Sequence, residues 1–443
     1  MSNQFPSSQR RARSASPPGR SLNRRSGIQC CRTDHPGAPA FLEASPCRAR
    51  ASRRLSRHPS SARRGILPSN QQLYHKRVHI LAAIGSIALI LIVLWDAFEV
   101  IILPRRVRRK FRLTRFFYRS TWKPWSAAAK RISSNDRREL LLSFYGPVSL
   151  LFLLSMWAAG LVLGFACLHL SLETPLKVED ASTGFRTYLY FSGSTFFTLG
   201  LGDVVAGTWT GRILTVFEAG MGLGFLAIVI GYLPVLYQAF SRRELNISLL
   251  DARAGSPSTA AELLRRHFDG DQFVELSAFL REWERWAAEL LESHLSYPVL
   301  AYYRSQHSNQ SWLGALTTIL DATTLVMVGI DGTPAHQAQL TFAIARHAVA
   351  DLAHVFNTRP QNPLKDRLPP DELGRMRGNL RRSGILLQDG DTAAEKLNAL
   401  RRMYEPYVHA LSEYLLMPLP SWEVAAKSAD NWQTSAWERI AHL

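Results

Sequence analysis

Three long runs of apolar residues dominate the hydropathy pattern of the chain up to residue 240. They cover residues 78–103, 140–170 and about 213–240. Each run is longer than the ~20 residues that a helix needs to cross ~30 Å of hydrocarbon. The pattern therefore predicts three transmembrane helices and an integral membrane protein.

A shorter apolar segment lies between the second and third runs. Residues 188–203 have the sequence YLYFSGSTFFTLGLGD, which is too short and too rich in glycine for a full span. We expect a short amphipathic helix here, followed by six residues that are not helical. Because irregular backbone at membrane depth must be covered by protein or line a water-filled space, this segment is predicted to re-enter the membrane beside such a space.

Beyond residue 240 the pattern becomes that of soluble helices, with apolar residues spaced three and four apart. The expected helices are 258–268, 271–294, 311–330, 335–357, about 371–384 and 391–416. Ser258 and Asp391 stand where two of them should begin, each followed by Thr-Ala-Ala-Glu. We therefore predict an α-helical domain over residues 241–443.

The first 70 residues differ from the rest of the chain. They are rich in Arg, Ser, Pro and Ala and show no hydrophobic periodicity. Such a composition buries too little apolar surface to offset its ordering entropy. Two interpretations remain open: a disordered basic tail, or an upstream region wrongly included in the coding sequence. The ordered protein is expected to begin near residues 74–78.

The formal charge of +18 is unevenly distributed. Residues 1–77 carry +14 and residues 105–138 carry +12, so the remainder is mildly acidic. The basic clusters flank an apolar run, and no nucleic-acid recognition motif is present, so we expect no nucleic-acid partner. Basic residues favour the cytoplasmic side, which places 104–139 and the C-terminal domain in the cytoplasm and the acidic loop after the second span outside.

Few residues point to metal or catalytic chemistry. The four cysteines, Cys30, Cys31, Cys47 and Cys167, have no metal-binding or disulfide spacing. His347, Asp351 and His354 share one helix face, a spacing that can hold a metal but that solvated or core histidines explain as well. No nucleophile or phosphate-binding motif occurs. We expect neither an enzyme nor a bound cofactor.

The sequence Thr-Leu-Gly-Leu-Gly-Asp at residues 198–203 has a specific physical use. A dehydrated potassium ion needs oxygen atoms in place of its water, and backbone carbonyls supply them only when successive residues turn them toward one axis. Gly200 and Gly202 permit the backbone angles that a β-carbon disfavours. The Thr198 hydroxyl can add a further ring of oxygens.

These residues resemble the pore module of the potassium-channel superfamily, whose filter has the sequence Thr-Val-Gly-Tyr-Gly-Asp. The matching residues are Thr198, Leu199, Gly200, Leu201, Gly202 and Asp203. The resemblance covers residues 140–240. It implies that Tyr190 and Phe191 brace the filter and that residues 213–240 form the inner, pore-lining helix. In that helix, it implies a hinge at Gly220, Gly222 and Gly224 and a lower bend at Pro234.

Two positions depart from the family pattern. Leu201 replaces the usual tyrosine, whose hydroxyl supports the filter from behind, and Phe197 replaces a threonine or serine. One chain carries one pore loop, whereas a fourfold ring of carbonyls needs four. The resemblance therefore implies a homotetramer with the filter on its axis. Because Leu201 replaces the tyrosine, the resemblance does not fix how strongly the filter selects potassium over sodium.

Other charged residues have more than one explanation. Glu218, in the upper half of the third span, is expected to brace the filter, titrate as a gate or pair with a polar neighbour such as Ser194 or Arg212. Asp96 and Glu99 are either functional or paired with the basic cluster that follows them. That cluster, residues 105–112, lies outside an apolar helix, which favours contact with anionic lipid headgroups along 105–138 over voltage sensing.

The sequence thus predicts an all-α membrane protein in the plasma membrane. It consists of a potassium-channel-like pore module (outer helix, pore helix and filter, inner helix) at 140–240, an extra N-terminal transmembrane helix and a C-terminal α-helical cytoplasmic domain. The expected function is passive potassium transport through a tetrameric pore. Two alternatives are a weakly selective monovalent cation channel and a non-conducting sensor or scaffold that retains the pore fold.

Overall fold

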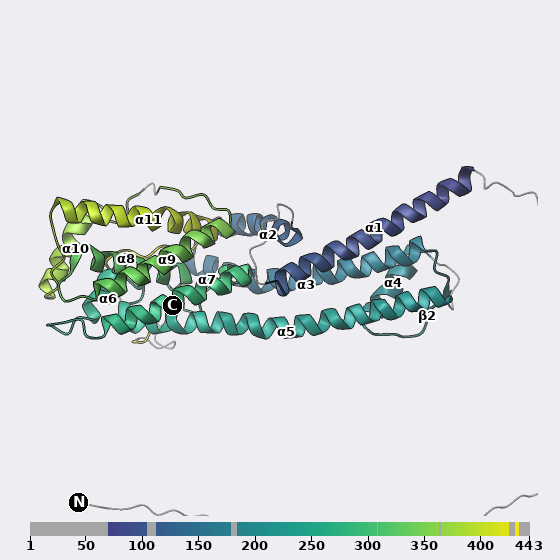
Figure 1. The fold of residues 1–443 in the computed structure, drawn as a ribbon, viewed down its shortest axis with the longest axis horizontal. Helices are drawn as coiled ribbons and strands as arrows, with labels where there is room; N and C mark the ends of the chain where they lie inside the picture. Colours follow the sequence, from purple (N-terminus) through teal and green to yellow (C-terminus); the bar gives the residue numbers. More distant parts are fainter. Residues whose placement is uncertain are drawn as a thin grey trace, which may run out of the picture. The chain divides into compact units, whose positions relative to one another are not determined.

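The computed structural model describes residues 70–103, 112–178, 184–307, 309–362, 365–424 and 430–433. All of them belong to one compact unit, residues 67–443. The expected tail (residues 1–70, apart from Asn70), the basic run at 105–110 and the loop acids Glu179 and Asp180 lie outside the described residues. The described part is built almost entirely from helices (Figure 1).

Four helices are long and apolar enough to cross a membrane: α1 (Asn70–Ile101), α3 (Asn135–Ser171), α5 (Trp209–Ala254) and α8 (Trp312–Gly329). The apolar window of α8 is 83% buried inside the protein, against 17% in α1 and 11% in α5. The helix α8 is therefore the core of the C-terminal domain, as its predicted place at 311–330 indicates. The three predicted spans are confirmed, and the chain is a multi-pass membrane protein.

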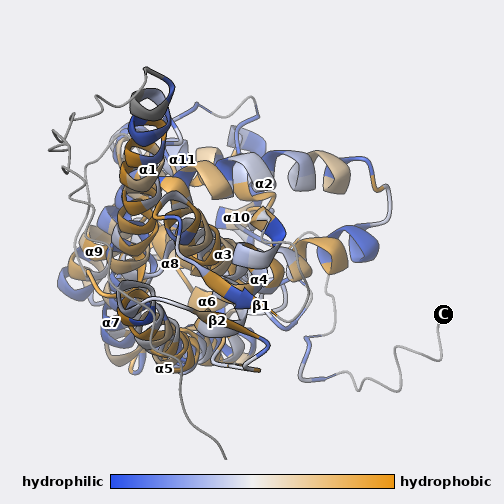
Figure 2. Cartoon of the chain, turned by 90° about the vertical axis from the view of Figure 1, so that its right-hand side faces the viewer, coloured by the Kyte–Doolittle hydropathy of each residue, from blue (hydrophilic) through white to orange (hydrophobic). Residues whose placement is uncertain are grey.

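The extra helix α1 packs along α3, and much of its length is hydrophobic (Figure 2). Two glycines four residues apart on α3 let the helices approach closely, a spacing that is common where membrane helices pack. A β-carbon on Gly164 would lie 2.6 Å from Cγ1 of Ile90, and one on Gly160 would lie 3.1 Å from Cγ2 of Val93. Position 164 therefore needs a glycine because a β-carbon there would clash with Ile90, and not because of its backbone conformation.

Replacing Gly164 by leucine is expected to push α1 away from α3 and to destabilise the protein by ~1–3 kcal/mol, the usual cost of overpacking. Gly85→Leu on α1 is the matched control, because nothing lies within 4 Å of its β-carbon position. Thermal unfolding of the detergent-solubilised protein, followed by tryptophan fluorescence, measures both. Equal midpoints for the two variants would show that this glycine contact does not hold α1.

The basic segment 104–139, expected as a linker, contains an amphipathic helix that the sequence analysis did not identify, α2 (Leu113–Lys130). Its N-terminus is capped by Asp96 of α1, whose carboxylate accepts hydrogen bonds from the Thr114 hydroxyl (2.6 Å) and backbone N–H (3.3 Å). The Trp157 indole also donates to Asp96, at 3.0 Å. Because this carboxylate is buried, its three donors replace the water that it would otherwise bind.

Glu99 lies one turn after Asp96 and is also buried. It forms an ion pair with Arg112 at 3.3 Å and accepts a hydrogen bond from the Trp95 indole at 2.6 Å. Both acids near the C-terminal end of α1 are therefore engaged, Asp96 with the N-terminus of α2 and Glu99 with Arg112. The basic residues 105–110, with which pairing was predicted, lie outside the described residues.

A short helix and a two-stranded sheet separate α3 from α5. The sheet pairs β1 (Leu176–Val178) with β2 (Val204–Ala206) in antiparallel register, Leu176 opposite Ala206. The helix α4 (Phe185–Phe196) packs against both α3 and α5. The expected re-entrant helix is therefore present, and β2 returns the chain from residue 203 to α5.

The C-terminal helices agree closely with the predicted ones. They are α6 (Ala260–Arg266), α7 (Leu276–Ser296), α8, α9 (Ala335–Val355), α10 (Pro370–Arg382) and α11 (Asp391–Leu415), with a 3₁₀ turn, η1 (Pro298–Tyr302), after α7. Thr259, one residue after the expected Ser258, caps α6 by accepting from the Glu262 backbone N–H. The helices α7, α8 and α11 all pack on α9.

The inner helix continues into this domain without a break. The predicted boundary at residue 240 lies inside α5, which ends at Ala254. Just below that boundary, the buried Arg243 donates to the carbonyls of Leu300 (2.8 Å) and Tyr303 (3.0 Å) around η1. The same guanidinium lies 3.3 Å from Nε2 of His294, and burial together with this cation holds the pKa of His294 well below its usual range.

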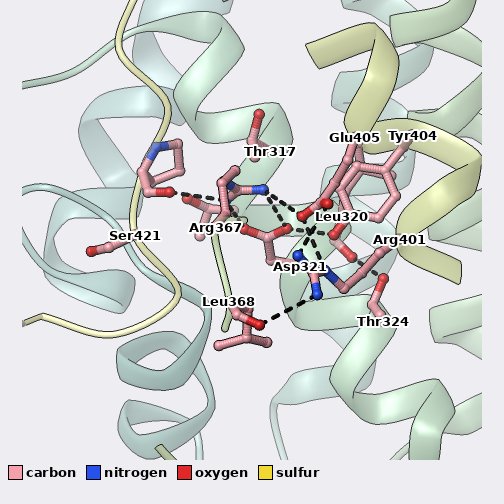
Figure 3. Close-up of polar contacts among 12 residues, drawn as sticks. Thr317, Leu320, Asp321, Thr324, Arg367, Leu368, Arg401, Tyr404, Glu405 and Ser421 are labelled. Carbon is pink, nitrogen blue, oxygen red and sulfur yellow. Dashed lines mark hydrogen bonds and ion pairs between the residues drawn. The ribbon is translucent and has the colours of Figure 1, made fainter. Parts of the chain in front are cut away.

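A buried ionic cluster stabilises the centre of the domain (Figure 3). Arg367 donates to the carboxylate of Asp321, which is fully buried on α8, at 2.5 Å, and to Glu405 on α11 at 3.3 Å. The Tyr404 hydroxyl donates to the same Asp321 at 2.5 Å. Arg401 completes the cluster through Glu405 and, like Arg367, lies over the Trp422 ring.

Arg367→Met is expected to destabilise the domain by ~3–5 kcal/mol, because removing one partner leaves the buried Asp321 carboxylate uncompensated. Arg375→Met is the control: Arg375 also lies near two carboxylates but is 67% exposed, so the expected loss is ~0–1 kcal/mol. Urea unfolding of the full chain in detergent measures the difference. Similar losses in both variants would contradict the structural importance of the buried cluster.

Candidate pore and filter

The backbone of residues 198–203 alternates in handedness. Thr198, Gly200 and Gly202 have φ of +57°, +55° and +85°, whereas Leu199 and Leu201 stay outside the left-handed region. In an ordinary extended chain, successive carbonyls point to opposite sides. Reversing every second residue turns them to the same side, which is the arrangement that coordination of a bare cation requires.

The first filter residues are tied to the last turn of α4. The backbone N–H groups of Thr198 and Leu199 donate to the carbonyls of Thr195 (3.0 Å) and Ser194 (2.8 Å). The filter segment therefore starts at a fixed point, the C-terminal end of the short helix. That end carries the partial negative charge of the helix, which favours a cation nearby.

The outer end of the segment is held by one side-chain contact. The Tyr190 hydroxyl donates to the Asp203 carboxylate at 2.8 Å and so links α4 to the last filter residue. Phe191 is buried on another side of α4, where its ring lies edge-on to His169 of α3, with centroids 5.1 Å apart. The structure thus brings Tyr190 to the filter segment and places Phe191 against the outer helix.

Among the described residues, little covers the side chains of the filter leucines. Leu199 is 64% exposed and Leu201 is 67% exposed. A β-carbon on either filter glycine would also meet no atom within 4 Å. The described part of the chain therefore leaves the two leucines largely uncovered.

Glu218 lies on the face of α5 that is turned to α3 and α4. Its side chain is fully buried, and its Oε2 lies 3.4 Å from Nε2 of His169. From the sequence, Ser194 or Arg212 was expected as its partner. The structure gives His169 instead, while Arg212 donates to the carbonyl of Ala206 at 3.2 Å.

The three glycines expected as a hinge differ in their surroundings. A β-carbon on Gly222 would lie 1.9 Å from the carbonyl oxygen of Phe196 at the end of α4, whereas one on Gly220 or Gly224 would meet nothing within 4 Å. Pro234 lies inside the same continuous helix. Gly222 therefore allows α5 to pack closely against the end of α4, next to the filter.

The histidine pattern in the C-terminal domain does not gather into a metal site. His347 pairs with Asp351 at 3.4 Å and is 58% exposed. Across the described ranges, no group of three or more His, Cys, Asp or Glu side chains is arranged to hold a metal ion.

Several contacts of this site were not found from the sequence. His169 and Glu218 are 49 positions apart on different helices, and no local pattern indicates that they meet. The left-handed angle of Thr198 is unusual for a residue with a β-carbon. The tyrosine–aspartate contact had a signal, because the resemblance to the potassium-channel pore module implied that Tyr190 braces the filter.

Comparisons with known proteins agree with this geometry. The family described as "Ion channel" matches residues 152–238, which contain most of α3, all of α4, the filter segment and the membrane part of α5. The chain is also 25% identical over 295 residues to the "Uncharacterized membrane protein YdjJ" of Bacillus subtilis (strain 168), across 65% of this chain and 81% of that protein. No solved structure matches the chain. Residues 152–238 are thus similar to an ion-channel family, consistent with the predicted resemblance.

Proposed function

We propose that this chain is one subunit of a homotetrameric, potassium-selective channel that conducts ions passively. The observation that carries the proposal is the alternation of left-handed residues at Thr198, Gly200 and Gly202. It turns successive carbonyls toward one side, and four such strands around an axis supply the oxygen cage that a dehydrated cation needs. The match to the ion-channel family supports the same function.

The exposed apolar surface of the pore module supports the tetramer. Leu199, Leu201 and the inner helix present large apolar side chains that the single chain leaves uncovered. Along α5 these are Trp209, Ile213, Val216, Phe217, Leu223, Ile228, Ile230, Leu233, Val235 and Tyr237. Lipid can cover an exposed face of a transmembrane helix. It is a poor cover for the filter leucines, because they lie next to backbone carbonyls that must contact ions in water. Neighbouring subunits around a fourfold axis would cover them.

Potassium is the proposed permeant ion on the strength of the filter sequence and its backbone. Leu201 supplies no hydroxyl behind the filter, so the Tyr190–Asp203 hydrogen bond carries more of the bracing at the outer end. A weaker margin against sodium is the alternative that this leucine favours. We propose no bound cofactor and no enzymatic activity.

The position of α2 supports an orientation with the C-terminal domain in the cytoplasm of a plasma-membrane protein. The exposed side of this helix and the residues after it are basic: Arg115, Arg119, Lys123, Lys130, Arg131 and Arg137. Phe116, also strongly exposed, stands among them. We propose that this surface contacts anionic lipid headgroups, at ~1 kcal/mol per basic residue.

Reversal potentials test the proposed function. The chain from about residue 70 onward is reconstituted in planar bilayers with potassium on one side and sodium on the other. A reversal near the potassium equilibrium potential supports a selective channel. A reversal near zero with clear current would replace it with a weakly selective cation channel. No current across a range of pH, voltage and lipid composition would favour a non-conducting sensor.

A further inference from the structure

A fully buried carboxylate lies behind the pore helix, within the membrane-spanning part of α5. Glu218 has no exposed surface. Its one ionic partner among the described residues is His169 of α3, at 3.4 Å. Two other charged groups of this part of the chain are engaged elsewhere: Glu173 pairs with His79, and Arg212 donates to the carbonyl of Ala206. An isolated carboxylate at this depth is costly, so its single histidine partner is significant.

The imidazole of His169 is held in a fixed orientation. Its Nδ1 lies 3.3 Å from the Thr174 hydroxyl, so that Nε2 faces the carboxylate. Its ring stands edge-on to Phe191 of α4. The residue has no exposed surface, and its surroundings come from all three helices of the pore module. One histidine thus connects the outer helix, the pore helix and the inner helix.

The carboxylate and the close glycine contact belong to the same face of α5. Glu218 and Gly222 are one helical turn apart, and a β-carbon on Gly222 would lie 1.9 Å from the carbonyl oxygen of Phe196 on α4. This close backbone contact fixes the register of α4 on α5 beside Glu218. Phe196 precedes Thr198 by two residues, so a shift of α4 along α5 moves the start of the filter.

We propose that His169 is a positioning residue for the filter, acting through Glu218. The two side chains lie 3.4 Å apart with no exposed surface, and this contact ties α3 to α5 across the back of α4. This inference rests on the proposed channel function and adds a residue that the filter sequence does not include. It predicts that selectivity depends on a pair of side chains that lie outside the conduction pathway.

Exchange of the two side chains tests the pair. The set consists of His169→Gln, Glu218→Gln, the double variant with His169→Glu and Glu218→His, and Ser171→Ala as a control. Ser171 is a buried hydroxyl at the end of α3 whose one hydrogen bond within the described ranges goes to the carbonyl of Leu168. Each variant is measured for the potassium-to-sodium permeability ratio. The second readout is the shift in thermal unfolding midpoint between potassium and sodium buffers, which does not need an open pore.

We expect each single variant to lower the permeability ratio about tenfold and to remove most of the potassium-dependent shift, because each leaves one buried group without its partner. The exchanged pair should recover at least half of both, while Ser171→Ala stays at the wild-type values. Single variants that keep the wild-type ratio and shift would overturn the inference. So would an exchanged pair that elutes as the wild-type oligomer yet behaves like the single variants.

The same two measurements on the wild-type protein distinguish a failure of this inference from a failure of the proposed channel function. A wild-type protein with neither potassium-selective current nor potassium-dependent stabilisation would overturn both. A wild-type protein with current and stabilisation, whose His169 variants are unchanged, would overturn only the role of His169.

Discussion

Replacing Gly200 by alanine is expected to abolish potassium selectivity. At φ of +55°, alanine costs ~1–2 kcal/mol relative to its right-handed conformation, and the proposed tetramer would incur this cost four times. The filter can relieve the strain by rotating the peptide unit, which in the proposed tetramer turns one ring of four carbonyls away from the axis. We expect the potassium-to-sodium permeability ratio from reversal potentials to fall to about one, or current to disappear, because the cation loses those ligands.

Gly184→Ala provides the control for this prediction. Gly184 precedes α4 with φ of −107°, and nothing lies within 4 Å of its β-carbon position. The same methyl group is added at the N-cap of α4, at the other end of that helix from the filter and without a left-handed backbone, so the cost is the ~1 kcal/mol by which alanine caps a helix less well than glycine. A Gly200→Ala channel with the wild-type reversal potential would show that the alternating backbone does not set selectivity.

The filter is the part of the site that sequence could predict, because its chemistry is local. Gly200 and Gly202 alone predict an alternating backbone, because this prediction does not depend on contacts with distant residues. The three spans are local in the same sense, since length and apolarity decide them. The sequence nevertheless did not predict that the alternation begins at Thr198, which has a left-handed φ although it is not a glycine.

The features that could not be predicted from the sequence depend on contacts between segments that are far apart in the chain. The role of Gly222 depends on the distance to a carbonyl 26 positions earlier, and glycine on a helix has several explanations without that distance. The helix α2 was missed because its basic residues were attributed to topology, although Phe117, Trp122 and Ala129 mark a buried face. Its cap is Asp96, on another helix, so no local start signal precedes it.

Gly222→Ala is expected to impair the filter from behind. An added β-carbon 1.9 Å from the Phe196 carbonyl oxygen cannot be accommodated by rotating a side chain, because the contacted atom is backbone. Either α4 or α5 must move, at ~1–3 kcal/mol per subunit for overpacking, and Phe196 is two residues from the first filter position. We therefore expect loss of the selective current and a lower thermal midpoint for the oligomer.

Gly220→Ala and Gly224→Ala place the same methyl group on the same helix, two residues to either side, where no atom lies within 4 Å. Alanine favours a helix by ~1 kcal/mol over glycine, so both controls should unfold at the same or a higher temperature and keep the wild-type reversal potential. If either glycine is a hinge, the open probability changes while selectivity does not. A Gly222→Ala protein that matches these two controls would mean that α4 is not seated on α5 through this contact, because only Gly222 combines the added methyl group with a backbone obstacle.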